Sequence, residues 1–152
     1  MCPGTRFKLY LRPKHTISPH DDPLPPLPPH KTVQQIFEDF LKYLHTCTRE
    51  YIEQTHVGGP QLWQDLQSEA VYILTHPNGW EGAQQAKMRK GAINAGLVPD
   101  TTAGHARIKF VTEGEASLLY CVSSKLSSDI TKASGLSTRP IIQVTTLNIV
   151  AE

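Results

Sequence analysis

The chain has 152 residues, of which 39% are hydrophobic, and this length is sufficient for one domain with a core of its own. Its 15 basic and 14 acidic residues leave a formal net charge of +1, and neither sign forms a long run. This balance excludes a basic arm that binds nucleic acid and an acidic tail, so no nucleic-acid partner is expected.

The cysteines and the short apolar runs indicate the compartment. Cys2, Cys47 and Cys121 are far apart and include no Cys-x-x-Cys pair, so free thiols in a reducing environment are expected. The first residues are too polar for a secretory signal, and no apolar run approaches the roughly 18 residues of a membrane span. We therefore expect a cytoplasmic protein with no membrane partner.

The first segment, residues 1–30, is predicted to hold a short strand and a proline-rich connector. Residues 6–11 alternate polar and apolar side chains, which favours a strand with Phe7, Leu9 and Leu11 on one face. Residues 18–31 hold half of the 12 prolines, and proline denies backbone hydrogen bonds to helix and sheet, so an extended, poorly packed connector is expected. Residues 26–31 also fit a PxxP ligand for an SH3-like groove, and this alternative stays open.

The clearest predicted element is a long amphipathic helix over residues 33–55. Thr32 and Gln35 have the spacing of a capping box at its start. Apolar side chains recur at helical spacing along one stripe, namely Val33, Ile36, Phe37, Phe40, Leu44, Cys47 and Tyr51. Gly58-Gly59-Pro60 ends this helix, and residues 61–69 are predicted to add a helical turn at the surface.

A strand, a helix and a second strand follow, in the order of a parallel crossover. The short apolar runs at residues 70–77 and 106–111 are predicted to be buried strands. Between them, residues 81–96 are predicted to form a helix and residues 98–105 a loop. Two strands joined in this way pair in parallel through a right-handed connection. A further helix is predicted over residues 115–122.

The helix predicted over residues 81–96 has marked ends and a face of small side chains. Asn78 and Glu81 have cap-like spacing at its start, and Gly96 closes it. Small side chains on one side suit close packing against a sheet; they are Ala83, Ala92 and Ala95. A solvated basic face is predicted for Lys87, Arg89 and Lys90.

Two loops with chemically active side chains are predicted beyond the carboxyl ends of the strands, where parallel sheets bind ligands. THPNGW follows the first strand and TEGEAS follows the second. Glu113 and Glu115 could form an acid/base pair or hold a water or metal, but acids in the first turn of a helix are also stabilised by its dipole alone. His76 could ligate a metal, act as a base or be a structural histidine. Trp80 could stack on a ligand or fill the space between helix and sheet.

In combination, these segments resemble the 70-kDa heat-shock protein superfamily. Its first lobe has a strand ending in proline, an alanine-rich helix ending in Ala-Gly-Leu, and a strand ending in a glutamate before another helix. VYILTHPNGWEGAQQAKMRKGAINAGL and RIKFVTEGEASLLYCV follow that order. HPNGWEG, TEGEASLLYC, FKLYLRP and FEDFLKYLHTCTREYI look more like the divergent branch typified by heat shock protein twelve-A and its fungal relatives. The resemblance covers residues 6–122.

This resemblance implies the fold and the site. Residues 31–122 are expected to form an α/β fold, part of the first lobe of an actin-like (ribonuclease H-like) ATPase domain with a short parallel sheet flanked by helices. Glu113 corresponds to the family's strand-end glutamate, which helps order the water shell of Mg²⁺ and the attacking water, so it is the candidate catalytic and cofactor-binding residue without being a direct metal ligand. Pro77 corresponds to the proline that relays the nucleotide state between lobes. Gly114 replaces the family's proline, and Glu115 replaces a small or hydroxyl residue.

The same resemblance implies ATP and Mg²⁺ as cofactors and client proteins as partners. The family grips ATP between two glycine-rich hairpins, with cores Asp-Gly-(Thr/Ser) and Asp-x-Gly-Gly-Gly-Thr, and neither occurs in this sequence. Residues 123–152 instead form a divergent Ser/Thr-rich segment with one strand-like run at 140–150. We expect a truncated piece or an incomplete gene product that binds ATP weakly or not at all and does not hydrolyse it alone. The alternative is a non-enzymatic interaction module that uses the proline-rich connector or the exposed lobe surface.

Overall fold

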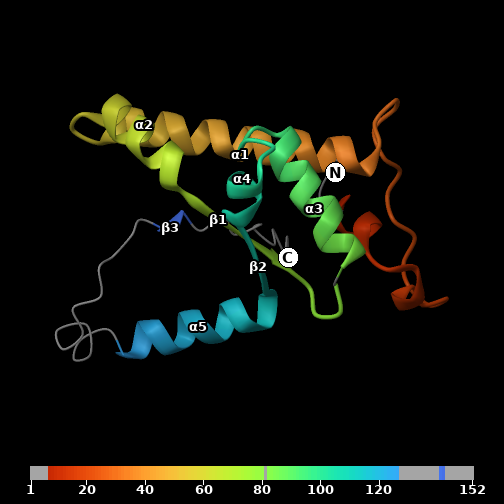
Figure 1. Cartoon of the computed structure of the whole chain (residues 1–152). Coiled ribbons are helices and arrows are strands. Elements are labelled where there is room, and N and C mark those ends of the chain that lie inside the picture. Colours follow the sequence, from red (N-terminus) through yellow and green to blue (C-terminus); the bar gives the residue numbers. More distant parts are fainter. Residues whose placement is uncertain (1–6, 81, 127–140, 143–152) are drawn as a thin grey trace.

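The computed structural model describes residues 7–80, 82–126 and 141–142, and shows a short parallel sheet flanked by helices (Figure 1). In chain order the elements are η1 (Phe7–Leu11), η2 (Lys14–Thr16), α1 (Val33–Thr55), α2 (Gly59–Glu69), β1 (Val71–His76), α3 (Ala83–Asn94), α4 (Thr102–Ala106), β2 (Ile108–Thr112), α5 (Glu113–Leu126) and β3 (Ile141–Ile142). The predicted mixed fold with a parallel sheet is thereby confirmed.

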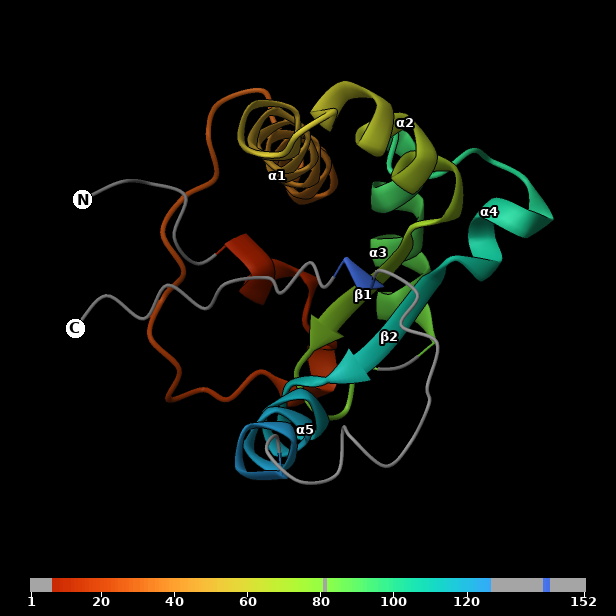
Figure 2. The same cartoon turned by 90° about the vertical axis from the view of Figure 1, so that its left-hand side faces the viewer.

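The sheet has the strand order β2-β1-β3, and β1 pairs in parallel with both neighbours. The pairing of β1 with β2 runs from Tyr72 opposite Ile108 to His76 opposite Thr112. Alternate positions of the two strands therefore face the helices together, and Tyr72, Leu74 and Ile108 are buried there. Both strands point toward the start of α5. The helices α1 and α2 lie at the opposite end of the strands, and α3 lies alongside them (Figure 2). The predicted parallel crossover is confirmed, with β2 shifted to Ile108–Thr112.

The prediction of a strand at residues 6–11 is wrong, because residues 7–11 form the 3₁₀ helix η1. Among the described residues, β1 pairs with β2 from Tyr72 to His76 and with β3 at Val71 and Tyr72. The apolar side chains of η1 pack on α1 instead: the ring of Phe7 lies 6.4 Å from that of Phe37 and 5.6 Å from that of Phe40, measured between centroids. Leu11 is buried in the same core. Packing against a helix thus replaces pairing in the sheet.

The proline-rich connector follows η2 and has no regular structure between residues 22 and 28. Its C-terminal end, at residues 28–31, does not continue in the extended polyproline conformation. The backbone N–H of Lys31 donates to the carbonyl oxygen of Pro28 at 3.2 Å, and His30 has a φ of 63°. This β-turn breaks the polyproline conformation that an SH3-like groove requires.

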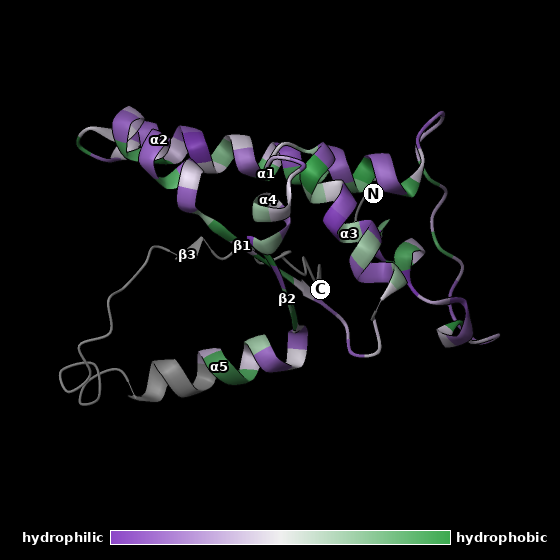
Figure 3. Ribbon diagram, viewed as in Figure 1, coloured by the Kyte–Doolittle hydropathy of each residue, from purple (hydrophilic) through white to green (hydrophobic). Residues whose placement is uncertain are grey.

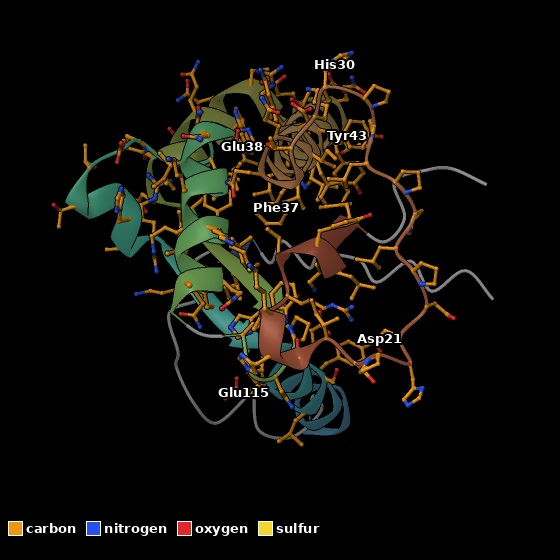
Figure 4. The ribbon with its side chains drawn as sticks, turned by 90° about the vertical axis from the view of Figure 1, so that its right-hand side faces the viewer. Asp21, His30, Phe37, Glu38, Tyr43 and Glu115 are labelled. Atoms are coloured by element: carbon orange, nitrogen blue, oxygen red, sulfur yellow. The ribbon has the colours of Figure 1, made fainter. Side chains whose placement is uncertain are left out.

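The long helix α1 has the predicted bounds and the predicted capping box. The Thr32 side chain accepts from the backbone N–H of Gln35, and the Gln35 side chain accepts from the backbone N–H of Thr32. Its buried stripe differs from the predicted one: Phe37 and Leu41 are buried, while Tyr51 is 63% exposed. Figure 4 shows Phe37 below α1, toward η1 and the sheet. The expected surface turn is longer than predicted, because α2 covers Gly59–Glu69.

The helix α3 packs closely, but it starts later than predicted. Its N-cap is Gly82, so the Asn78 cap is wrong, and Glu81 lies outside the described residues. Gly96 has a φ of 80°, and Gly96 and Leu97 donate backbone hydrogen bonds to Ile93 and Ala92, which is a Schellman motif. Ala92 and Ala95 are buried as expected, but Ala83 is exposed.

Residues 98–105 are not only a loop, because α4 begins at Thr102 and is capped by Thr101. The predicted solvated basic face is also wrong at Arg89. Its guanidinium donates to the carbonyl oxygens of His105 at 2.6 Å and Ile108 at 3.0 Å, and lies over the Phe110 ring. Arg89 therefore ties α3 to β2, while Lys87 and Lys90 are exposed.

The core lies between α1, α3, η1 and the facing side of the sheet. Its buried members are Leu11, Phe37, Leu41, Ala70, Tyr72, Leu74, Trp80, Met88, Ala92, Ala95, Leu97, Val98 and Ile108. The helix α5 extends from the opposite end of the sheet, and its part nearest the sheet has apolar as well as polar residues (Figure 3). Within residues 7–80, 82–126 and 141–142, no helix has both the length and the apolar character needed to cross a membrane.

The third predicted segment, residues 123–152, lies mostly outside the described residues, as does most of its strand-like run at 140–150. Of that run, the structure describes β3, which pairs with β1 opposite Val71 and Tyr72. The boundary expected after residue 122 falls inside α5, since this helix continues to Leu126.

Candidate functional site at the carboxyl edge of the sheet

The two loops with candidate site residues meet at one end of the sheet, which we call the carboxyl edge (residues 76–80 and 112–115). His76 and Thr112 are the last paired residues of β1 and β2. Pro77 and Glu113 therefore follow at neighbouring strand ends, as the sequence predicts. An added Cβ at Gly114 would lie 3.8 Å from Oδ1 of Asn78, so the first turn of α5 lies beside the loop after β1.

The first loop is shaped by residues that end β1 and return the chain to the core. Pro77 has no N–H to donate to a neighbouring strand, which stops the ladder. The backbone N–H of Trp80 donates to the carbonyl oxygen of Pro77 at 3.3 Å, and Gly79 between them has a φ of 79°. Trp80 is buried in the core, which supports its interpretation as a plug between helix and sheet.

The second loop contains a capping box that the sequence analysis missed. The backbone N–H of Glu115 donates to the Thr112 hydroxyl at 3.1 Å, and the Glu115 carboxylate accepts from the backbone N–H of Thr112 at 2.9 Å. Thr112-Glu113-Gly114-Glu115 has the Thr-x-x-Glu spacing of this motif, so the signal was present. The hydrogen bonds from Thr112 lower the pKa of Glu115. Glu115 therefore acts as a helix cap, which supports the structural alternative over an acid/base role.

Glu113 has a partner from the other end of the chain. The Nζ of Lys8 in η1 donates to Oε1 of Glu113 in an ion pair, with the Lys8 and Glu113 side chains 17% and 31% exposed. The two residues are 105 positions apart, so no spacing in the sequence could have indicated this contact. Glu113 is thus held at the strand end, and its charge is compensated by an ammonium group.

His76 is a structural histidine. Its Nδ1 lies 2.8 Å from the carbonyl oxygen of Pro77, which can only accept, so Nδ1 carries the proton. Its Nε2 then accepts from the Gln85 amide at 3.1 Å. Because both ring nitrogens are engaged and the side chain is buried, His76 offers no lone pair to a metal or substrate.

The carboxyl edge therefore contains two carboxylates that are held in different ways. The Glu115 carboxylate caps α5, whereas the Glu113 carboxylate pairs with the side chain of Lys8. Among the described residues, no group of three or more His, Cys, Asp or Glu side chains could hold a metal ion. A surface depression lined by Asp65, Leu66, Ser68 and Glu69 lies at the end of α2, which precedes the opposite end of β1. Protein-family models, curated proteins and solved structures were compared with the chain, and none matches it.

Proposed function

We propose that this chain is part of the first lobe of an actin-like ATPase of the 70-kDa heat-shock protein superfamily. In it, Glu113 orders the water shell of a nucleotide-bound Mg²⁺ ion and Pro77 relays the nucleotide state. One observation carries the proposal: the parallel β1-α3-β2 crossover brings Pro77 and Glu113 to neighbouring strand ends, with a helix starting at the glutamate. This is the arrangement that the resemblance over residues 6–122 implies. Unfolded client proteins are the partners expected of such an ATPase.

The position of Glu113 suits an indirect role with a cation. A partly exposed carboxylate at a strand end can accept hydrogen bonds from metal-bound water without entering the coordination sphere. Mg²⁺ usually keeps several of its waters, so such outer contacts are a normal way for a protein to hold it. The other carboxylate of the edge, Glu115, is committed to the cap of α5.

Turnover by this chain alone is not expected. Phosphoryl transfer depends on positioning and on charge stabilisation by the metal and by donors around the phosphates. The sequence contains neither of the two glycine-rich phosphate hairpins, and an isolated carboxylate repels an anionic nucleotide. ATP binding by the chain should therefore be weak or absent.

The test uses the chain and an extended protein to which both glycine-rich hairpins and the second lobe have been added. The extended protein should gain thermal stability from Mg·ATP, because a ligand that binds only the folded state stabilises it. Glu113→Ala should lower its turnover with little loss of ATP binding, whereas Glu115→Gln should leave turnover nearly unchanged. Phosphate release by the 152-residue chain that Glu113→Ala abolishes would show that Glu113 belongs to an active site that forms without the two hairpins, and would contradict the proposal of an incomplete lobe.

A non-enzymatic interaction module is the second candidate, and one observation favours it. Tyr43 and Tyr51 lie two helical turns apart on α1, both are largely exposed, and the half-buried thiol of Cys47 lies between them. Such a stripe is a typical contact surface for another protein. An extended protein with no response to Mg·ATP would favour this candidate over the ATPase.

A further inference from the structure

The ion pair between Lys8 and Glu113 joins the carboxyl edge to an element that is anchored elsewhere. Phe7 and Leu11, on either side of Lys8, pack in the core beneath α1. The Tyr10 hydroxyl donates to the carbonyl oxygen of Pro25 at 2.6 Å, which fixes η1 to the connector. Lys8 therefore reaches Glu113 from a firmly held segment, and only 17% of its side chain is exposed.

Among the described residues, few contacts other than that with Lys8 restrain the Glu113 carboxylate. Its backbone carbonyl accepts from the Ser117 hydroxyl at 2.8 Å, but this bond restrains the helix and not the side chain. The neighbouring carboxylate of Glu115 faces its own cap. The direction of the Glu113 carboxylate is thus set mainly by the charge of Lys8.

We propose that Lys8 is a charge latch that regulates Glu113: while the ion pair is closed, the carboxylate faces η1 and is withheld from a hydrated cation. The latch opens when a cation competes for the carboxylate. This inference rests on the proposed function for its purpose, since it is the regulation of that same site. The latch itself is a property of the described chain and can be measured without nucleotide.

Chemical labelling of carboxylates measures the latch directly. A water-soluble carbodiimide activates an accessible carboxylate, which then forms an amide with added glycine ethyl ester and is located by mass spectrometry. Lys8→Met removes the charge but keeps an unbranched side chain in the same packing. Lys8→Arg keeps the charge and cannot compete with the added amine. Glu113 should be labelled about two to five times faster in Lys8→Met than in Lys8→Arg, the range expected for a partly exposed ion pair.

Two controls separate a latch from a general loosening of the fold. Glu115 should be labelled at the same rate in both variants, because its partner is Thr112. In the wild-type chain, carbodiimide alone should join Lys8 to Glu113 through an amide bond with loss of one water. Rising salt should speed the labelling of Glu113 in Lys8→Arg and leave Lys8→Met unchanged.

Equal labelling of Glu113 in the two variants would overturn the latch, as would a parallel rise at Glu115. Either result would leave the ATPase proposal to its own test, because no nucleotide is involved. Conversely, if the extended protein does not bind ATP while the labelling differs as expected, the latch stands and the proposed function fails.

Discussion

The helices α3 and α5 both follow a strand of the same parallel pair, yet they are held in different ways. Met88 and Ala92 of α3 are fully buried, and Gly91 lies against the Phe37 ring. In α5, Leu118 and Leu119 are 65% and 63% exposed, and the described contacts concentrate in its first turn. Thus α3 is held by packing along its length, whereas α5 is held at one end by a capping box and an ion pair.

This difference has a consequence for stability and for the site. Burial of a large apolar side chain contributes about 1.5–3 kcal/mol, whereas a partly exposed ion pair contributes about 0–1 kcal/mol. We therefore expect α3 to unfold only with the whole domain and α5 to open locally. The candidate site therefore lies at the junction between the well-packed sheet and the first turn of α5, beyond which this helix is held less firmly.

Truncation of one side chain in each helix should give the largest contrast. Met88→Ala should lower the free energy of unfolding by about 2–5 kcal/mol, because it leaves a cavity in the core. Leu118→Ala should change it by less than about 0.5 kcal/mol, because the side chain is exposed. Urea unfolding followed by circular dichroism measures both. Similar losses for the two variants would show that α5 is packed in solution and would remove the contrast.

The same glycine substitution should act in opposite directions in the two helices. At Gly91, a Cβ would lie 2.7 Å from Cδ1 of the buried Phe37, so Gly91→Ala should cost about 1–3 kcal/mol through overpacking. At Gly114, the nearest atom would be Oδ1 of Asn78 at 3.8 Å, so Gly114→Ala should stabilise the chain by up to about 1 kcal/mol. Thermal unfolding of both variants tests the signs. Stabilisation by Gly91→Ala would mean that α1 and α3 are not in close contact.

Local signals in the sequence were sufficient to predict the elements that are marked by apolar spacing and by capping residues. The bounds and cap of α1 follow from apolar spacing and the Thr32–Gln35 pair, and the parallel crossover follows from two apolar runs around a helix with small side chains. The positions of Pro77 and Glu113 at neighbouring strand ends follow from that crossover. Each of the elements involved is marked by residues that lie close together in the sequence, so it can be recognised along the chain.

Contacts between distant segments could not be predicted in the same way. The alternation of residues 6–11 fits a strand, but the aromatic rings of α1 provide a better apolar surface for Phe7. Arg89 lies among basic residues in the sequence, with Lys87 and Lys90 close to it, yet its partners are carbonyl groups near β2. Lys8 reaches Glu113 across the fold. Each depends on tertiary packing, which overrides local preference.

As the pH is lowered, the free energy of unfolding of the packed region around His45 should fall before the first turn of α5 is affected. Burial between Trp63 and Tyr72, with Arg49 nearby, lowers the pKa of His45. The unfolded chain then takes up a proton near the usual pKa of about 6.5 while the folded chain resists it, so stability falls as the pH drops through that value. The difference in unfolding free energy between wild type and His45→Gln should change between about pH 8 and about pH 5. A constant difference would show that the imidazole is accessible to water.

The smallest effect concerns the two capping boxes, one charged and one neutral. The hydrogen bonds from Thr112 lower the pKa of Glu115, so its contribution to α5 is present above the unfolded value of 4.5 and is lost as the pH falls through the lower folded value. The cap of α1 has the neutral Gln35 at the same position and should not titrate.

Amide exchange in the first turn of α5 should be faster in Glu115→Gln than in wild type at neutral pH, and the two should converge in acid after correction for intrinsic rates. In α1, Gln35→Glu should introduce the same acid dependence at residues 32–35. If the first turn of α5 responds to acid equally in wild type and Glu115→Gln, the Glu115 cap does not stabilise this turn.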